Sequence, residues 1–459
     1  MEYIKSKDMC ILIRDTLALI DNRIIEHGSR TAYILSCMLA CKGGYEQYEI
    51  ADLAILAILH DFGAYKTDNV HEMMRVELQD PMPHSIYGYL FFRYLSPHPE
   101  YARILLYHHL DYNQTKDKEG EYIELARHLN LAEKVEIYHS AMENDFSAAM
   151  LSKDIGTRYG EESFQLLEEA IQKYKIIEKL TNGSYAEELD KILDYVLLSD
   201  EEKVGYLNML MYCIGFRSEY AVIDSVTCIC VCKEIGKLCG LREEEQELLY
   251  YSALLHDIGM LSVPRKIIQS KDHLDPEQTA ILQKHVLCAR EILLGRINQD
   301  VVDVVYTHHE RLDGSGYPVG KKTGPMNLLQ RILQIADLIT SLTNEWSYDT
   351  VRRKDGTLRQ ITDEAITLEQ NTENEAVIMQ SGTKNSAVNA LRQATKEKTI
   401  RVLEEETKAG RLDKRIVDSF IKAYDMIMQE VRRESKEILK MHTKLHRQYR
   451  LVYHKIKKK

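Results

Sequence analysis

The sequence of 459 residues has only eight prolines, one tryptophan and no long uninterrupted apolar run. Because proline is scarce and apolar positions recur at helical spacing in almost every long window, the chain is predicted to be all-α. No apolar stretch approaches the roughly 18 residues of a membrane-spanning helix. The start of the chain spreads acidic and basic residues through its apolar positions, which predicts an amphipathic helix instead of a signal peptide. We therefore expect a cytoplasmic protein without a membrane span.

Positive charge is also in short supply: 60 Lys and Arg residues stand against 71 Asp and Glu residues, for a formal net charge of −11. A nucleic-acid backbone selects for clustered Lys and Arg, so no nucleic-acid polymer is expected as a partner. The basic tip at residues 455–459 is interpreted as a solvated chain end. Nine scattered cysteines, an odd number, indicate a reducing compartment. Cys228, Cys230 and Cys232 lie in a helical pattern that turns neighbouring side chains apart, which disfavours a zinc site.

What the chain does contain is an internal repeat rich in histidine. In the first half, HGSRTAYIL at His27 is followed by HDFG at His60, MPHSIYGYL at His84, YHHLDYN at His108 and a helical segment with Glu133. In the second half, DSVTCICV at Asp224 is followed by HDIG at His256, LQKHVLCAREIL at His285, THHERLDGSGYP at His308 and QRILQIADLITSL at Asp337. Nine of the 17 histidines fall on this grid, which chance placement would not produce.

In the second half, HDIG followed by HHERLDGSGYP resembles the two signature motifs of the HD-GYP family, metal-dependent phosphodiesterases that open cyclic dinucleotides such as cyclic di-GMP. The resemblance implies two tandem HD-type helical bundles. The predicted parts are a degenerate HD domain without the GYP loop at 1–175, a helical linker at 176–205, an HD-GYP domain at 206–425 with an insertion at about 349–395, and a C-terminal helix with its basic tip at 426–459.

An HD pair at the end of an apolar helix offers an imidazole and a carboxylate at adjacent positions, which suits iron or manganese better than a closed zinc site. The resemblance implies two divalent ions, iron or manganese, and phosphodiester hydrolysis. The implied metal ligands are Asp224, His256, Asp257, His285, His308, His309 and Asp337. The implied catalytic residues are Asp257, His308, His309 and Asp313. The implied substrate contacts are Gly314, Gly316, Tyr317, Pro318, Trp346, Arg352 and Arg353.

The first half keeps a more complete set of candidate ligands but replaces the GYP loop by DYNQTKDKEG. It is a candidate for a second metal site, and its candidate ligands are His27, His60, Asp61, His84, His108, His109 and Glu133.

The second half departs from the family at three places. Asp224 stands where a histidine is usual, Met260 where a lysine is implied to hold a substrate phosphate, and Trp346 in a segment that usually grips the dinucleotide. Three hypotheses therefore stay open: a phosphodiesterase that works through the second half, a degenerate tandem protein that binds a nucleotide or regulates partners, and a phosphohydrolase that uses the first half.

The last segment is predicted to be a long charged helix. Its apolar positions recur at about heptad spacing, which is compatible both with a homodimer through this helix and with packing onto its own domain. These positions are Ile427, Val431, Ile438, Met441 and Leu445.

Overall fold

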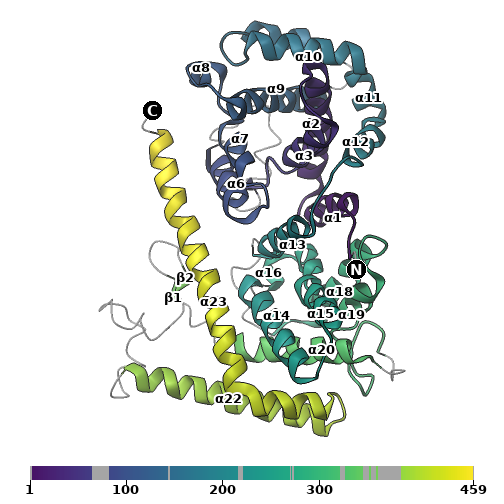
Figure 1. Ribbon diagram of the computed structural model, residues 1–459, viewed down its shortest axis with the longest axis vertical. Helices are drawn as coiled ribbons and strands as arrows, with labels where there is room; N and C mark the ends of the chain where they lie inside the picture. Colours follow the sequence, from purple (N-terminus) through teal and green to yellow (C-terminus); the bar gives the residue numbers. More distant parts are fainter. Residues whose placement is uncertain are drawn as a thin grey trace. The chain divides into compact units, whose positions relative to one another are not determined.

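The computed structural model describes residues 3–64, 82–142, 145–215, 221–268, 270, 273–320, 326–344, 351–352, 358–359 and 384–457. The chain divides into two compact units: the first unit is Ile4–Leu210 with Arg447–Lys459, and the second unit is Met211–His446 with Met1–Tyr3. Within the described residues, both consist of helices apart from one antiparallel pair of two-residue strands, β1 (Val351–Arg352) and β2 (Leu358–Arg359) (Figure 1). The predicted all-α class is confirmed.

No helix in the described ranges has both the length and the apolar character that a membrane crossing requires.

The first unit is organised around α2 (Asn22–Lys42), which begins where the Asp21 side chain accepts a hydrogen bond from the Arg23 amide at 3.0 Å and ends at Gly43 in the left-handed region. Gly28 in this helix lies so close to α3 that a Cβ atom there would be 2.3 Å from the Ile58 carbonyl oxygen. This contact brings His27 beside the end of α3. The helices of the unit are α1 (Ser6–Ala18), α2, α3 (Gln47–Ile58), α6 (Met82–Leu95), η1 (Pro99–Tyr101), α7 (Ala102–Tyr107), α8 (Tyr112–Thr115), α9 (Glu121–Met142), η3 (Ala148–Asp154), α10 (Glu161–Tyr174), α11 (Ile176–Asn182), α12 (Tyr185–Leu193) and most of α13 (Asp200–Ile214).

The segment 176–205, predicted as a linker, is part of the body of the first unit. Helices α11 and α12 pack on α2, and α12 also packs on α3. Their inner side chains, such as Ile176 and Leu189, are fully buried. The boundary between the two units lies between Leu210 and Met211. The segment predicted as a linker therefore contributes its apolar face to the core of the first unit.

The second unit repeats the same helix pairings. Helix α14 (Ala221–Leu238) packs on α15 (Glu243–Leu255) and on α20 (Leu328–Asn344), as α2 packs on α3 and α9. The other helices are η4 (Ile258–Ser262), α16 (Arg265–Ile268), α17 (Pro276–Gln283), α18 (His285–Leu293), α19 (Gln299–Tyr306), α22 (Lys384–Lys408) and α23 (Lys414–Lys457). The repeat seen in the motifs is therefore also a repeat of helix packing.

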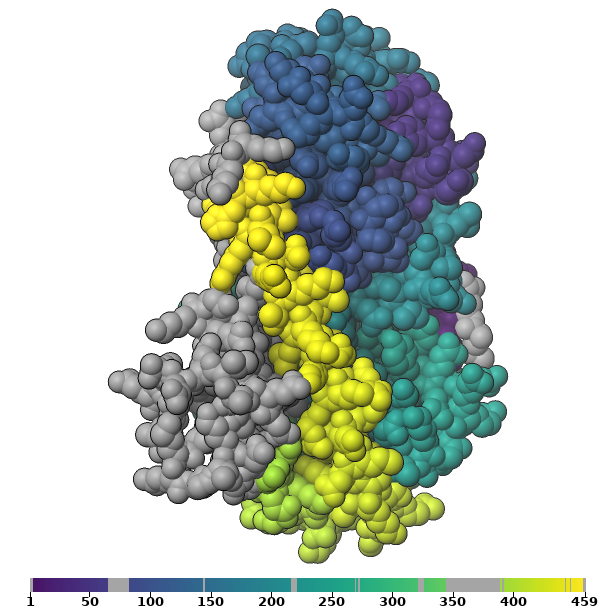
Figure 2. Space-filling model, turned by 60° about the vertical axis from the view of Figure 1, so that its left-hand side comes forward, coloured from purple at the N-terminus to yellow at the C-terminus, as the bar shows by residue number. Residues whose placement is uncertain are grey.

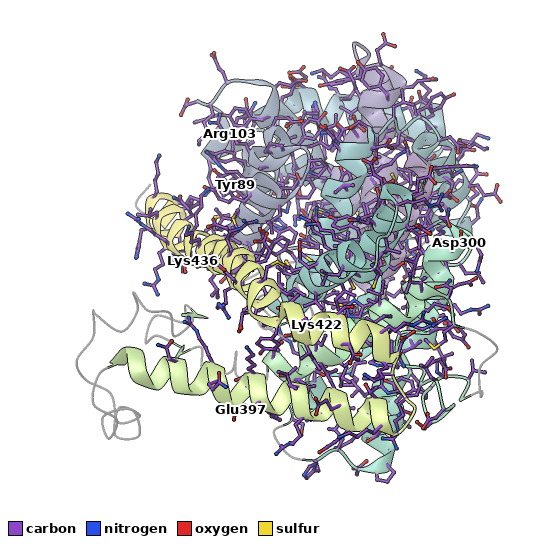
Figure 3. All side chains as sticks on the ribbon, turned by 60° about the horizontal axis from the view of Figure 1, so that its bottom comes forward. Tyr89, Arg103, Asp300, Glu397, Lys422 and Lys436 are labelled. Atoms are coloured by element: carbon purple, nitrogen blue, oxygen red, sulfur yellow. The ribbon has the colours of Figure 1, made fainter. Side chains whose placement is uncertain are left out.

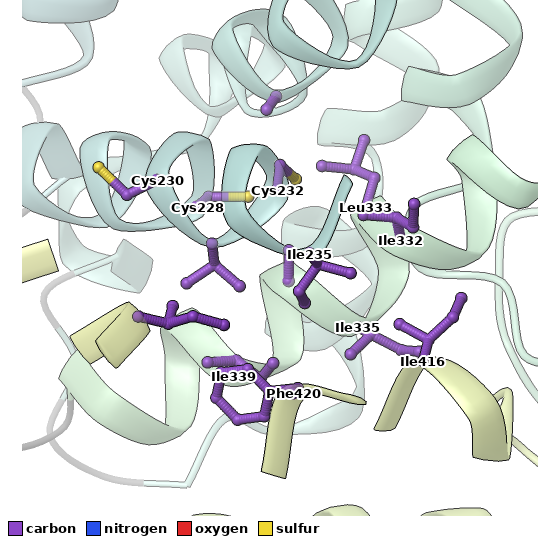
Figure 4. Close-up of a cluster of buried hydrophobic side chains, with 14 of the residues drawn as sticks. Cys228, Cys230, Cys232, Ile235, Ile332, Leu333, Ile335, Ile339, Ile416 and Phe420 are labelled. Atoms are coloured by element: carbon purple, nitrogen blue, oxygen red, sulfur yellow. The ribbon is translucent and has the colours of Figure 1, made fainter. Parts of the chain in front are cut away.

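The core of the second unit joins α14, α20 and α23. Figure 4 shows Cys228, Cys232 and Ile235 of α14 against Ile332, Leu333, Ile335 and Ile339 of α20, with Ile416 and Phe420 of α23 closing the cluster. The sulfur of Cys230 points away from those of the other two cysteines (Figure 4). This apolar contact fixes the orientation of α20, on whose other face Asp337 lies.

Helices α22 and α23 occupy the region where the last two segment boundaries were predicted. Helix α22 begins at Lys384, inside the predicted insertion at about 349–395, whose extent stays a prediction, and the predicted boundary at 425/426 falls inside α23. The Lys396 ammonium lies 2.6 Å from a carboxylate oxygen of Asp425 and joins the two helices. Glu397 and Lys422 are exposed (Figure 3), and Figure 2 shows α22 and α23 at the molecular surface.

Several of the heptad positions in α23 are used inside the second unit. Ile427 and Val431 belong to its buried core, and Ile438 packs against a small cluster of Leu439 and Ile223. Packing within the unit thus explains these positions, and the homodimer through this helix stays a prediction.

Candidate functional site

Three histidines of the second unit are oriented in the same way at helix ends. Their Nδ1 atoms lie near the carbonyl oxygen three residues earlier: His256 at 2.8 Å from Ala253, His285 at 2.7 Å from Leu282 and His308 at 2.6 Å from Val305. A carbonyl can only accept, so the Nδ1–H donates and Nε2 carries the lone pair. Carbonyls at a helix end lack an amide partner. The backbone therefore fixes the tautomer in which Nε2 can bind a metal.

These Nε2 atoms converge on two carboxylates. Asp257 Oδ2 is 3.3 Å from His256 Nε2, and Asp257 Oδ1 is 3.6 Å from His285 Nε2. Asp337 Oδ2 is 3.3 Å from His309 Nδ1, and its Oδ1 is 3.9 Å from His256 Nε2. His285 and His308 face each other with their Nε2 atoms 3.4 Å apart. Six of the seven metal ligands implied by the resemblance are thus brought together from α15, α18, α19 and α20.

One side of this cluster is open to solvent. The side chains of Asp257, Asp337 and His309 are 29%, 21% and 20% exposed, whereas His256, His285 and His308 are buried. The arrangement has buried ligands on one side and accessible ones on the other, as a site that admits a substrate needs.

The electrostatics of the cluster favour neutral imidazoles at His285, His308 and His309, whereas Asp257 raises the pKa of His256 well above its usual value, against the effect of burial. Burial and the neighbouring His285 together lower the pKa of His309 to about 3. Burial alone would raise the pKa of Asp257, but His256 holds it well below its usual range. Burial raises the pKa of Asp337 to about 6, against the opposite effect of His256. Neutral imidazole and carboxylate are the forms that bind divalent ions.

The loop at 313–320 lies directly against the cluster. The Tyr317 ring centroid is 4.7 Å from that of His309. Gly316 approaches the backbone so closely that a Cβ atom would be 2.4 Å from the Arg311 amide nitrogen and from the His309 carbonyl oxygen. Gly314 has a φ of 81°, which favours glycine. Tyr317 therefore borders the open side, and the roles of Gly314, Gly316, Tyr317 and Pro318 as substrate contacts stay predictions. Trp346 and Arg353 lie outside the described residues, and Arg352 is described only as backbone of β1.

Asp313, predicted to be catalytic, holds this loop in place. Its Oδ1 accepts hydrogen bonds from the Ser315 amide at 2.9 Å and the Ser315 hydroxyl at 2.6 Å, and its Oδ2 lies 3.3 Å from Arg411 Nε. These bonds direct the carboxylate into the loop, and a catalytic role for it stays a prediction without a contact that supports it.

We expect Asp313→Ala to reduce kcat/KM about tenfold, mainly through a higher KM, and Asp313→Asn to stay near wild type because the amide oxygen still accepts from Ser315. Arg411→Ala should also reduce kcat/KM, but by less than Asp313→Ala, because an exposed ion pair contributes little. Steady-state kinetics of the three variants would test this. A general acid or base typically contributes a factor of about 10²–10⁴ in rate, so a loss of that size in Asp313→Asn would support a catalytic role for Asp313.

Asp224 lies in the first turn of α14 and is half-buried. Among the described residues, the second-unit group of at least three ligand atoms that all lie within 4.8 Å of one another comprises His285, His308 and His309. Asp224 is not in that group, and its role as a ligand stays a prediction.

Two supporting residues, Glu310 and Gln334, were not identified from the sequence. The Glu310 carboxylate accepts from the Val319 amide at 2.7 Å and from the Gly320 amide at 3.3 Å, which closes the loop. The buried Gln334 amide donates to the Glu310 carbonyl and, at 3.3 Å, to the Arg411 carbonyl. The internal repeat could have identified Gln334, because both halves have a side-chain amide one turn before the last candidate ligand: Gln334 before Asp337, and Asn130 before Glu133.

The first unit contains a second cluster built on the same plan. Asp61 lies at its centre, and His60 and His108 again direct Nδ1 to the carbonyls of Ala57 and Leu105, both at 2.7 Å. The structure brings together all seven candidate ligands of this half, in overlapping groups whose ligand atoms lie within 4.8 Å of one another: His27, His60, Asp61, His84, His108, His109 and Glu133.

Both clusters have the donors that a divalent metal requires. In the first, the Nε2 atoms of His27, His60 and His108, together with one Asp61 oxygen, are buried without a hydrogen-bond partner among the described residues. Acceptors that face each other in a buried place are unfavourable unless a cation lies between them. Burial would lower the pKa of His27, but Glu136 and Asp61 raise it to about 10. The two carboxylates therefore favour a positive charge beside them, which is a proton on His27 when no metal ion is bound.

Comparison with known proteins agrees with this geometry. The HD domain family matches residues 214–367. A 3'3'-cGAMP-specific phosphodiesterase of Vibrio cholerae is 26% identical over 363 residues, which cover 71% of this chain and 79% of the relative. A cyclic di-GMP phosphodiesterase of Thermotoga maritima is 29% identical over 140 residues, 28% of this chain and 38% of the relative.

A solved structure of a cyclic GMP-AMP specific phosphodiesterase of V. cholerae matches with a TM-score of 0.53 at 14% identity, over 92% of this chain and 98% of that one. At this identity the likeness concerns the fold. The family match, the fold and the donor set agree on an HD domain in the second unit. The ordered HDIG and HHERLDGSGYP motifs resemble those of the HD-GYP type, and the chain is similar to phosphodiesterases that act on cyclic dinucleotides.

Proposed function

We propose that the chain hydrolyses a 3'3'-linked cyclic dinucleotide at the cluster of the second unit. The observation that carries the proposal is the open side of this cluster: the exposed edges of Asp257, Asp337 and His309 lie beside the loop that holds Tyr317. The first cluster has neither an exposed ligand nor this loop. Since the 3'3'-cGAMP-specific relative aligns along most of the chain, 3'3'-cGAMP is the substrate to test first, with cyclic di-GMP beside it.

His256, Asp257, His285, His308, His309 and Asp337 would hold the metal ions. When bound, divalent ions at such a site activate water and stabilise the charge on the attacked phosphate. The backbone carbonyls keep the imidazoles in the required tautomer, and Tyr317 covers one face of His309.

Arg311 is the residue that we propose to contact the substrate phosphate. Its Nη1 atom is buried without a hydrogen-bond partner among the described residues, and its charge acts on His309, Tyr317 and Asp337. This cation is therefore close to the open side and has capacity to bind an anion. It would supply the charge that Met260 cannot.

Replacing this cation should weaken substrate binding more than chemistry. We expect Arg311→Gln to raise KM about tenfold or more, as for loss of a charge-assisted hydrogen bond to phosphate. Arg401→Gln, which removes an exposed arginine of α22, is the matched control. Equal KM values in the two variants would exclude Arg311 from substrate binding.

The test of the function is turnover of 3'3'-cGAMP and cyclic di-GMP by the Mn²⁺-loaded full chain, with products separated by chromatography. The proposal expects a linear dinucleotide or mononucleotides to accumulate. Binding without any product, with the metal shown to be present by elemental analysis, would instead support the nucleotide-binding or regulatory module.

A further inference from the structure

The first unit presents metal-binding atoms to the interior and not to the solvent. A carbonyl accepts from His60 Nδ1 and another from His108 Nδ1, so both Nε2 atoms carry lone pairs. They lie 3.4 Å and 3.6 Å from oxygens of Asp61. These distances exceed the roughly 2.7–3.2 Å of a hydrogen bond, yet they are below the roughly 4.2 Å that two ligands of one ion, each about 2.1 Å from it, can span.

The ligands fall on two sides of the same carboxylate. On the Oδ2 side, His27 Nε2 is at 3.5 Å and His60 Nε2 at 3.4 Å. On the Oδ1 side are His84 at 3.5 Å, His108 at 3.6 Å and His109 at 3.8 Å. Glu133 joins this second side through an oxygen 3.3 Å from His109 Nδ1. A carboxylate with imidazoles at both oxygens is the arrangement of a bridge between two ions.

The orientation of His27 is fixed from behind. Its Nδ1 contacts the buried Glu136 carboxylate, and the other oxygen of Glu136 accepts a hydrogen bond from the Ser140 hydroxyl at 2.6 Å and lies 3.6 Å from Arg30 Nη1. Metal-bound histidines typically have such a carboxylate behind them. In the second unit the position of His27 is taken by Asp224, so this support belongs to the first unit.

The two clusters differ in how far their side chains are exposed to solvent. The side chains of Asp61, His109 and Glu133 are 4%, 2% and 1% exposed, against 29%, 20% and 21% for Asp257, His309 and Asp337. A substrate that reaches the second cluster thus has no comparable access to the first.

From these observations we propose that the first unit binds two divalent cations bridged by Asp61 in a centre closed to substrate, which stabilises the unit. This inference does not depend on the reaction of the second unit.

The test is release of Mn²⁺ from the loaded full chain to a chromogenic chelator, with total metal measured by elemental analysis. We expect about four Mn²⁺ per chain, two for each two-metal site. About half should be released rapidly and the rest at least about tenfold more slowly, because release from the closed centre requires local opening.

Matched variants assign the two phases. Asp61→Asn, which keeps the side-chain size, should remove the slow phase and lower the melting temperature, and Asp257→Asn should remove the fast phase. His128→Gln changes another buried histidine on α9 and should keep both phases. Glu136→Gln should retain the metal but accelerate the slow phase about tenfold or more, as for loss of an outer carboxylate.

A single rapid phase in the wild-type protein, or full metal content in folded Asp61→Asn, would overturn the proposal. If Asp61→Asn does not fold, the proposal is tested by the release phases of the wild-type protein and by the release rate of Glu136→Gln, because these measurements do not use Asp61→Asn. An unchanged slow phase in Glu136→Gln would then count against the proposal.

Discussion

Asp257→Asn is expected to lower kcat for the cyclic dinucleotide by about a thousandfold or more, because the substitution removes the charge that holds two sides of a two-metal site together. Asp257 faces His256 with one oxygen and His285 with the other, so an amide, whose nitrogen cannot act as a ligand, breaks one of the two contacts. The measurement is product formation at saturating substrate, with metal content determined in the same sample.

Asp300→Asn is the control for this variant, since it makes the same chemical change on an exposed residue of α19 (Figure 3). Wild-type turnover in Asp257→Asn together with loss of turnover in Asp61→Asn would move the reaction to the first unit, which is the third hypothesis raised by the sequence. Wild-type turnover in both Asp257→Asn and Asp61→Asn would show that neither cluster is the site of the reaction.

Gly259→Ala should damage both stability and turnover. A Cβ atom at this position would lie 2.0 Å from the His285 carbonyl oxygen and 2.8 Å from the Ala289 amide nitrogen, both of which are backbone atoms that cannot rotate away. Segment η4 must then move away from α18, and His285 moves with it. We expect the melting temperature to fall by roughly 5–10 °C and turnover to fall at least about tenfold, since catalysis is sensitive to displacements of about 1 Å.

Gly88→Ala provides the comparison. Its Cβ atom would be 3.5 Å from the His60 carbonyl oxygen, an ordinary contact, and alanine is the better helix former. This variant should be as stable as wild type or slightly more stable. A Gly259→Ala protein that melts and turns over like Gly88→Ala would show that η4 and α18 are not held in the close approach described above.

The sequence predicted which candidate ligands lie close together because their residues follow one another in a fixed order at helix ends, and their role as metal ligands stays a prediction. His256, Asp257, His285, His308, His309 and Asp337 lie together as the motif order implied, and the all-α class follows from apolar periodicity. The motifs could not show where the carboxylate of Asp313 points, because such a group can either take part in catalysis or hold the loop in place. Asp313 belongs to the motif, but its partner Arg411 comes from a distant segment, and no local pattern connects them.

The domain boundaries were harder for a related reason. The segment 176–205 is charged on one face, which resembles a solvated linker, yet Leu180 and Leu193 on the other face are buried in the first unit. Likewise, the heptad spacing of Ile427 and Val431 is the same whether the helix meets a second chain or its own core. Local sequence specifies an amphipathic helix and leaves its partner unspecified.

The hydrogen bonds from His256, His285, His308, His60 and His108 to the carbonyl three residues earlier have an evolutionary consequence. Each histidine is aimed by its own helix end, so its direction does not depend on which side chains surround it. Neighbouring positions are then free to change while the ligand geometry persists. Met260 can stand where the family has a lysine and the first half can lack the GYP loop, yet in both halves imidazoles lie beside the aspartate of the HD pair.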